Sequence, residues 1–180
     1  TDGNERTPRL SHQLGLKTLV GAWLGTDRAK NEVELASAIE VARAGHADLL
    51  AFGNEVLLRE DLPEAELVDS LRRAREALPG VKLGYVDAYY LFCQHPRLVE
   101  ACDVLLANCY PFWEYCDLEH SLAYMKEMHA RVERIAGLVG WSDPRIRALL
   151  PALDHYRDVF YRHLGRLLAA RRERSPAPGA

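Results

Sequence analysis

Apolar residues along the chain alternate between short continuous runs and longer stretches with helical spacing. The continuous runs predict four buried strands, over residues 16–25, 48–54, 81–90 and 102–110. Apolar residues that recur every three or four positions predict helices over residues 31–45, 62–80, 95–101 and 117–137. Strand and helix therefore alternate along this part of the chain, and short connecting segments join them.

This alternation is typical of an α/β fold with a parallel sheet. The strand runs are apolar almost throughout, which predicts burial on both faces of the sheet. A doubly wound sheet and a (β/α)8 TIM barrel both fit the pattern. A nucleotide-binding sheet carries a glycine-rich turn after its first strand, whereas the segment after Trp23 reads LGTDRAKNE. The sequence therefore favours the barrel.

A further helical period spans residues 146–167, and the final stretch, RRERSPAPGA, predicts a solvated tail. We therefore expect a partial barrel domain at 1–141, a helical segment at 142–170 and a disordered tail at 171–180. An amphipathic helix in the second segment could cover the exposed edge of an unclosed barrel.

Composition narrows the classes of function. The 180 residues carry a net charge of −3 and lack the basic stripe that is typical of nucleic-acid binding. No apolar run approaches the roughly 20 residues that span a bilayer, and the sequence begins without a secretory leader. The four cysteines lack the CxxC spacing of zinc and redox sites, so we expect free and mostly buried thiols. The histidines form no HExxH pattern, and we expect neither a metal nor an organic cofactor.

Candidate chemistry gathers where the predicted strands end, which is where barrels hold their active sites. The residues there are Trp23, Asn54, Glu55, Asp87, Asn108, Tyr110 and Trp113. Aromatic rings stack on the apolar faces of sugars, while amides and carboxylates bind sugar hydroxyls. A carboxyl group in such a site can donate a proton to a glycosidic oxygen. We therefore predict a carbohydrate site with Glu55 as the acid and the other residues in contact with the sugar.

Some of these residues also fit structural roles. Glu55 could be a surface carboxylate in a loop, Asp87 could cap the segment that follows it, and the three aromatic residues could belong to the core. Glu114 and Asp117 could each supply a second carboxylate, although Asp117 fits better at the N-terminus of the helix that follows.

Four segments carry a resemblance to a known family: HQLGLKTLVGAWLGTDRAKNE, GNEVLLREDLP, HPRLVEACDVLLANCYPFWE and, more weakly, GLVGWSDP. From about Thr1 to Trp141 the chain resembles the family-17 glycoside hydrolases, the β-1,3-glucanase family, and its bacterial members above all. The resemblance implies that the four strands are strands 3 to 6 of an incomplete barrel. It also implies that Glu55 is the general acid/base of a retaining mechanism and that Asn54 contacts the sugar. Asp87 matches an acidic position at the end of strand 5.

The same resemblance implies that Tyr110 and Trp113 belong to the sugar-binding segment after strand 6. The family places its nucleophilic glutamate in a segment similar to ETGWPS at the end of strand 7, where this chain reads LVGWSDP and holds Leu138. The strand that should precede this position reads as continued helix. A retaining mechanism needs two carboxyl groups about 5 Å apart, and only one of them is visible in this sequence.

Two functions therefore remain open. One is a glycoside hydrolase or transglycosylase acting on β-1,3-glucan, with its nucleophile supplied by another chain or segment. The other is a catalytically inactive partial barrel that binds carbohydrate or serves as a scaffold. A doubly wound domain with an unrelated function is a more distant alternative.

The enzyme and the inactive-barrel hypotheses both predict β-glucan or an oligosaccharide as the ligand, no nucleic acid as a partner, and self-association through an unclosed sheet edge. The resemblance implies an extracytoplasmic or membrane-associated location, because family members are commonly exported or bound to membranes.

Overall fold

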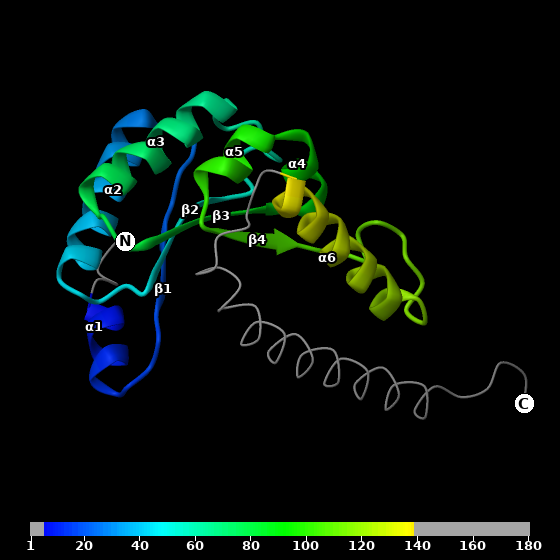
Figure 1. Ribbon diagram of the computed structural model, residues 1–180, viewed down its shortest axis with the longest axis horizontal. Coiled ribbons are helices and arrows are strands. Elements are labelled where there is room, and N and C mark those ends of the chain that lie inside the picture. Colours follow the sequence, from blue (N-terminus) through cyan, green and yellow to red (C-terminus); the bar gives the residue numbers. More distant parts are fainter. Residues whose placement is uncertain (1–5, 139–180) are drawn as a thin grey trace, which may run out of the picture.

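A computed structural model of the chain describes residues 6–138, whose arrangement is drawn in Figure 1. The elements are, in order, α1 (Arg6–Gln13), β1 (Leu19–Ala22), α2 (Arg28–Arg43), β2 (Leu49–Asn54), α3 (Glu64–Ala77), β3 (Lys82–Ala88), α4 (Tyr89–Gln94), α5 (Pro96–Ala101), β4 (Val104–Asn108) and α6 (Ser121–Leu138). Each strand lies inside one of the four predicted apolar runs. The expected helix at 146–167 and the segments 142–170 and 171–180 lie outside the described residues.

The four strands form one parallel sheet in the order β1-β2-β3-β4, so neighbours in space are also neighbours in sequence. Helix α2 contacts β1 and β2, α3 contacts β2 and β3, α4 contacts β3, and α6 contacts β4. Figure 1 shows these helices along one side of the sheet. A doubly wound sheet reverses its strand order at a switch point, whereas this order continues in one direction. The α/β class and the incomplete TIM-barrel-like architecture expected from the sequence are therefore confirmed.

The hydrophobic core lies between the sheet and the helices. Its largest fully buried apolar side chains are Leu50, Phe52, Leu83 and Tyr85 from the sheet and Leu67, Leu71, Phe92, Leu98 and Val99 from the helices. Burying one such side chain stabilises the fold by roughly 1.5–3 kcal/mol relative to leaving it exposed. Local sequence fixes where helix α2 begins and ends. Asp27 caps its N-terminus by accepting a hydrogen bond from the Lys30 amide, and Gly45 follows its C-terminus with a left-handed φ of 75°.

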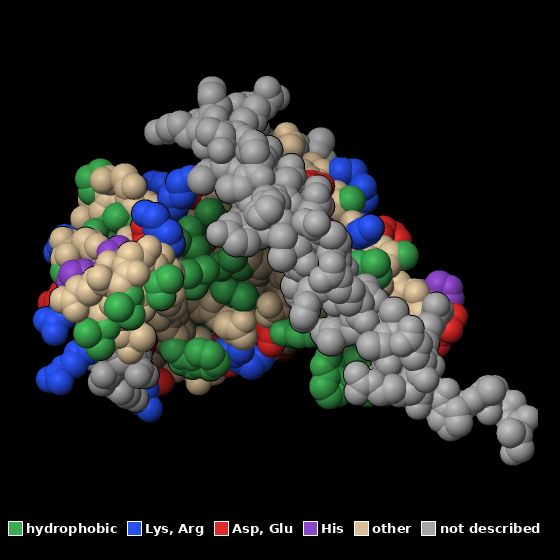
Figure 2. Space-filling view, turned by 90° about the horizontal axis from the view of Figure 1, so that it is seen from below, with side chains coloured by type: hydrophobic (Ala, Val, Ile, Leu, Met, Phe, Trp, Pro, Cys, Tyr) green, Lys and Arg blue, Asp and Glu red, His purple; other side chains and the backbone are tan. Residues whose placement is uncertain are grey.

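The opposite face of the sheet carries small or partly exposed side chains. Gly21, Ala51, Gly84 and Val104 are register partners across the four strands. A Cβ atom on Gly84 would meet the Val104 carbonyl oxygen at 2.9 Å, so the strands approach closely there. Figure 2, drawn from below Figure 1, shows hydrophobic side chains in the hollow on this side of the molecule. In a closed barrel this face is the interior, which agrees with an incomplete ring of strands.

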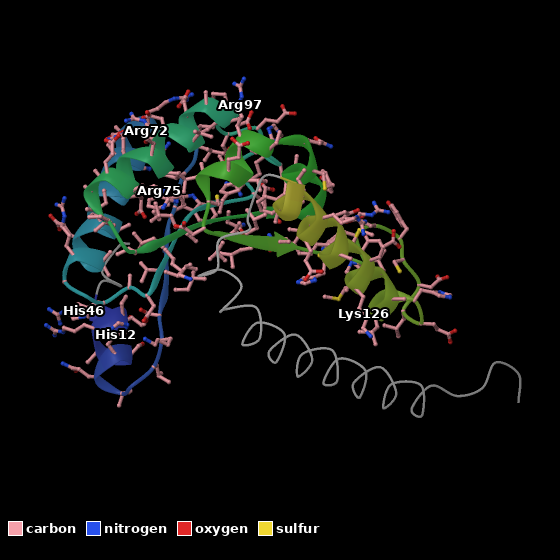
Figure 3. All side chains as sticks on the ribbon, viewed as in Figure 1. His12, His46, Arg72, Arg75, Arg97 and Lys126 are labelled. Carbon is pink, nitrogen blue, oxygen red and sulfur yellow. The ribbon has the colours of Figure 1, made fainter. Side chains whose placement is uncertain are left out.

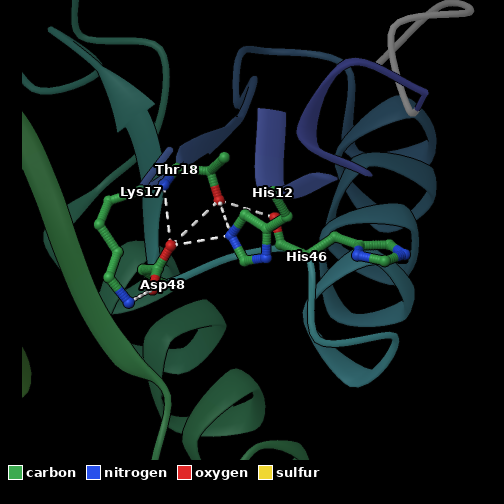
Figure 4. A network of polar contacts seen from close by, with 5 residues as sticks. All are labelled: His12, Lys17, Thr18, His46 and Asp48. Carbon is green, nitrogen blue, oxygen red and sulfur yellow. Dashed lines mark hydrogen bonds and ion pairs between the residues drawn. The ribbon is translucent and has the colours of Figure 1, made fainter. Parts of the chain in front are cut away.

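A polar network around Asp48 joins the N-terminal ends of β1 and β2, as Figure 4 shows. Lys17 donates to Asp48 Oδ1 at 2.7 Å, the Thr18 amide donates to Oδ2 at 2.8 Å, and His12 Nε2 lies 2.9 Å from Oδ2. The lysine and amide hydrogen bonds hold the pKa of Asp48 well below its usual value. His12 belongs to α1, so the network attaches this helix to the N-terminal ends of β1 and β2. Asn54 and Asn108 lie at the opposite, C-terminal ends of their strands.

Basic residues are spread over the outer helices in Figure 3, where Arg72, Arg75 and Arg97 lie on α3 and α5 and Lys126 lies on α6. Among them Arg75 has a clear structural role. It donates to the Asp103 carboxylate and to the Ala101 carbonyl oxygen, both at 3.0 Å, and thereby ties α3 to the segment that enters β4.

The structure adds helix α1, which the sequence pattern did not predict, and corrects two details of the sequence interpretation. Strand β3 ends at Ala88, and Tyr89 and Tyr90 begin α4 instead of extending the strand. Tyr89 and Phe92, three residues apart, are buried on one side of this helix, and this packing outweighs the strand preference of aromatic residues. All four cysteines are free as expected, but only Cys102 is buried.

Candidate functional site

The β2–α3 connection holds Glu55 in an unusual backbone conformation. Glu55 follows the last residue of β2 and has a φ of 55°, and Gly53, two residues earlier, has a φ of 78°. A Cβ atom on Gly53 would lie 2.5 Å from Val56 Cγ2, so only glycine fits there without displacement. A left-handed conformation at a residue other than glycine costs on the order of 1–3 kcal/mol and often marks a functional position. The sequence GNE therefore encodes a sharp turn that lifts Glu55 out of the strand.

The Glu55 carboxylate meets two donors that come from the end of β4. Asn108 Nδ2 donates to Glu55 Oε1 at 2.9 Å, and the Tyr110 hydroxyl donates to the same oxygen at 2.7 Å. Asn108 also lies 3.3 Å from the side-chain oxygen of Asn54. Because parallel strands all end at one edge of the sheet, residues more than 50 positions apart converge here. Four of the seven predicted site residues, Asn54, Glu55, Asn108 and Tyr110, thus form one hydrogen-bonded group.

Tyr110 is a donor at neutral pH. Its hydrogen bond to the Glu55 carboxylate, together with burial, raises the pKa of Tyr110 to about 12. The hydroxyl therefore keeps its proton and continues to hold the Glu55 side chain. About a third of the Tyr110 side chain is exposed, at 37%, so the ring is also accessible from solvent.

Trp23 lies beside this group at the end of β1. The Arg59 guanidinium stands over the Trp23 ring, 5.1 Å from its centroid, and also donates to the carbonyl oxygen of Asn54. Asp61 accepts from Arg59 at 2.8 Å and fixes the guanidinium from the other side. Trp23 remains 60% exposed, so its ring is an open aromatic surface next to Asn54 and does not belong to the core.

The segment after β4 exposes further aromatic rings. Phe112 and Trp113 are 80% and 72% exposed, and their rings meet edge to face at 5.5 Å between centroids. Glu114 accepts hydrogen bonds from the hydroxyls of Tyr89 and Tyr124, which joins this segment to α4 and α6. Trp113 is therefore a solvent-facing ring, as a sugar-stacking residue requires, and the core alternative for it is wrong.

Asp87 lies where sequence reasoning did not place it. Its side chain is fully buried at 0% exposure, on the side of β3 that faces the helices. The register explains this position, since Asp87 is paired with Ala107 and the inward-facing Asn108 is paired with Ala88. A direct contact between Asp87 and a sugar does not fit this burial. The capping alternative is wrong as well, because α4 has Ala88 as its N-cap residue and no side-chain hydrogen bond at that cap. Asp87 instead accepts from the Ala88 amide at 2.7 Å and from the Leu57 amide at 3.2 Å.

Two tyrosines around the site, Tyr85 and Tyr124, were not recognised as site residues from the sequence. Tyr85 is buried and donates to Asp87, and Tyr124 donates to Glu114. Burial raises the pKa of Tyr90, and so do the negative charges near it, those of Glu114 and Asp87 first. The period-2 pattern of β3 could have identified Tyr85, since it shares a strand face with Asp87. Tyr124 offers no such signal, because it belongs to a helix far along the chain.

The second carboxylate is the remaining question. Helix α6 continues through Leu138, so the expectation that this segment is helical and not a strand is confirmed. Asp117 does not begin this helix, which starts at Ser121.

Within residues 6–138, no helix is both long and apolar enough to cross a membrane, and no cluster of three or more His, Cys, Asp or Glu residues is arranged to hold a metal ion.

Residues 1–140 match the family described as the BtgE/BtgC glycoside hydrolase domain. The fold is similar to the crystal structure of a glycoside hydrolase family 17 β-1,3-glucanosyltransferase from Rhizomucor miehei, with a TM-score of 0.67 and 21% identity over 75% of this chain and 52% of that one. It is also similar to an active-site mutant of Rhizomucor miehei β-1,3-glucanosyltransferase in complex with laminaritriose, with a TM-score of 0.65 and 22% identity over 72% of this chain and 50% of the other. The chain spans about half the length of these structures. No curated protein sequence matches it.

Proposed function

Because the chain belongs to the BtgE/BtgC glycoside hydrolase domain family, we propose that its strand-end site acts on β-1,3-linked glucan, with Glu55 as the proton donor. The observation that carries this proposal is the convergence of Asn108 and Tyr110 on the Glu55 carboxylate at the carboxyl ends of the strands. The likeness to the glucanosyltransferase and the sequence resemblance to family 17 agree with this assignment of the substrate.

In the proposed reaction, the Glu55 carboxyl gives its proton to the glycosidic oxygen while the bond from that oxygen to the anomeric carbon breaks. A second carboxylate forms a bond to the anomeric carbon from the opposite face. Glu55, now ionised, then takes a proton from the attacking water or sugar hydroxyl, which releases the glycosyl group. The product is a hydrolysed or an elongated chain, depending on which acceptor enters.

This chain supplies the first carboxyl group by itself. Leu138 stands at the position where the family resemblance expects the nucleophile, and its side chain has no carboxylate. We therefore propose that turnover requires a second carboxylate from another chain or segment. The contacts at Glu55 do not depend on it, so glucan binding is expected from the chain alone.

The surrounding residues have proposed binding roles. The side-chain amides of Asn54 and Asn108 are placed to bind sugar hydroxyls, and the exposed rings of Trp23 and Trp113 offer stacking surfaces. Asp87 acts from beneath the site. We expect that an oligosaccharide of several sugar units is needed to contact both tryptophans, because Trp23 follows β1 and Trp113 follows β4, the two outer strands of the sheet.

The test is a titration of the purified chain with laminaritriose, followed by nuclear magnetic resonance, with cellotriose as the β-1,4-linked comparison. Binding of laminaritriose that shifts the signals of Asn108 and Tyr110 supports the proposal. Glu55→Gln should weaken binding and abolish any release of sugar from laminarin. Glu60→Gln is the matched control, since Glu60 is exposed and also has a left-handed φ, of 57°, in the same turn. Equal effects of the two substitutions would contradict a special role for Glu55.

A catalytically inactive, glucan-binding scaffold is the second candidate, and Leu138 is the observation that favours it. The two candidates differ in one measurement. Release or transfer of sugar that Glu55→Gln abolishes identifies an enzyme, whereas laminaritriose binding without any turnover identifies the scaffold.

Self-association is also part of the proposal. Within the described residues, β1 and β4 each have a strand neighbour on one side only. Exposed sheet edges favour pairing with another chain. Light scattering over a range of concentrations should therefore show oligomers, and a monomer at every concentration would count against pairing through these edges.

A further inference from the structure

A buried polar pair lies directly beneath the turn that carries Glu55. Tyr85 and Asp87 occupy alternate positions on β3, and both side chains are fully buried at 0% exposure. The Tyr85 hydroxyl donates to Asp87 Oδ2. The Ala88 amide donates to the other carboxylate oxygen at 2.7 Å. Two ionisable side chains in the centre of an apolar core are costly to bury and need a structural reason.

Both members of the pair bind the same backbone amide. The N–H group of Leu57 donates to the Tyr85 hydroxyl oxygen at 3.0 Å and to Asp87 Oδ2 at 3.2 Å. Leu57 is two residues after Glu55. The turn is also attached before this point, because the Glu55 amide donates to the Val86 carbonyl oxygen at 2.9 Å. Strand β3 therefore fixes the main chain on both sides of the peptide that follows Glu55.

Between these two attachments the backbone has little freedom. Val56 is fully buried, and its side chain occupies the space that the missing Cβ of Gly53 leaves open. A left-handed φ at a residue such as Glu55 persists only where the surroundings fix it more strongly than its own preference opposes it. The contacts from Val86, Tyr85 and Asp87 supply that constraint.

We propose that Tyr85 and Asp87 are positioning residues, which hold the Glu55 turn in its left-handed conformation and thereby place the carboxyl group against Asn108 and Tyr110. The consequence for glycosidic cleavage rests on the proposed function of Glu55. The holding of the turn does not rest on it and can be measured without any sugar.

The chemistry of the pair explains why these residue types are required. Three donors converge on the Asp87 carboxylate, from Tyr85, Leu57 and Ala88. A carboxylate can accept from all of them, whereas an amide would present an N–H group to at least one donor. The Tyr85 hydroxyl donates to Asp87 and accepts from Leu57, so a phenylalanine ring would fill the same space and lose both contacts.

The test compares Tyr85→Phe and Asp87→Asn with Phe92→Leu in the full chain. Phe92 is also fully buried and its ring meets that of Tyr85 at 6.0 Å between centroids, so Phe92→Leu weakens the same core without removing a polar contact to the turn. Amide hydrogen exchange is measured at Leu57 and at amides within β2 and β3, and chemical shifts report the backbone conformation of Glu55. Laminaritriose binding is measured on the same samples.

We expect Tyr85→Phe and Asp87→Asn to speed exchange at Leu57 by about tenfold more than at the strand amides, the order of effect of losing a buried hydrogen bond. The Glu55 shifts should move away from the left-handed range, and laminaritriose binding should weaken. Phe92→Leu should speed all these amides alike and leave the Glu55 shifts unchanged. If Asp87→Asn does not fold, Tyr85→Phe carries the test, because it keeps the ring.

Two results would overturn the inference. One is an equal loss of protection at Leu57 and at the strand amides in all three variants. The other is an unchanged Glu55 conformation after Leu57 has lost its protection. If the unmodified chain does not bind laminaritriose, the proposed function fails, but the exchange and shift measurements still decide the positioning role.

Discussion

Replacing Gly53 by alanine is the sharpest single test of how the turn before Glu55 is built. The residue has a φ of 78°, which an L side chain rarely adopts, and an added Cβ would lie 2.5 Å from Val56 Cγ2. Val56 is fully buried and cannot move away without disturbing the core. Gly45→Ala provides a matched control, because its φ of 75° is nearly the same and nothing lies within 4 Å of the added atom.

The expected magnitudes follow from these two environments. The left-handed conformation alone costs an alanine roughly 1–2 kcal/mol, and Gly45→Ala should lower the free energy of unfolding by about that amount. Gly53→Ala bears the same cost and also overpacks the core, which typically adds about 1–3 kcal/mol. Its total loss of about 2–5 kcal/mol is a large part of the roughly 5–15 kcal/mol by which a domain is stable.

Urea unfolding followed by far-ultraviolet circular dichroism measures both changes on one scale. Laminaritriose binding is measured under conditions where both variants are folded. Gly53→Ala should also weaken binding, because relieving the clash displaces the Glu55 turn. Gly45→Ala should leave binding unchanged, because Gly45 lies near the N-terminal end of β2, away from Glu55. Equal destabilisation by the two substitutions would refute the argument from the Val56 contact.

Three further predictions concern the polar contacts. Asp48 has a lowered pKa in the folded chain, so the stability it contributes is fully present above about pH 4 and declines as the pH falls. Asp48→Asn should lower the free energy of unfolding at neutral pH and reduce the loss of stability at acid pH, which unfolding measured over a range of pH tests. Glu55→Gln should bring the pKa of Tyr110 down from about 12 towards 10.0. A pH titration of the tyrosine ring signals by nuclear magnetic resonance measures this change, and an unchanged pKa would contradict the hydrogen bond to Glu55. Tyr124→Phe should lower the stability by about 1 kcal/mol and speed amide exchange around Glu114, because the Glu114 carboxylate loses a donor; slow exchange in the variant would show that this contact does not hold the segment.

Much of the fold could be read from the apolar pattern. Each observed strand lies inside a predicted run. The predicted burial on both faces holds for the two inner strands, β2 and β3, whereas β1 and β4 are largely half-buried or exposed. The boundaries were less predictable. Tyr89 and Tyr90 favour a strand locally, but the helix they begin gains packing against α6, and a tertiary contact of this kind has no local signal.

The candidate site shows the same division. Asn54, Glu55 and Asn108 could be placed together from the sequence, because parallel strands end at one edge of a sheet. Asp87 comes from the same edge but belongs to the other face, and one step in register decides between contact with a ligand and burial under the helices.

The α/β class, the four strands and the cluster of amide, carboxylate and aromatic residues at their ends could all be predicted from the order of residues along the chain. These features depend on periodicity and chain direction, which are local properties. The buried pair of Tyr85 and Asp87 under the Glu55 turn, and the contacts of Tyr89 and Tyr124 with Glu114, became visible in the folded chain alone. Such contacts join residues on different elements, and their hydrogen bonds exist only where strand register and helix packing bring donor and acceptor within about 3 Å.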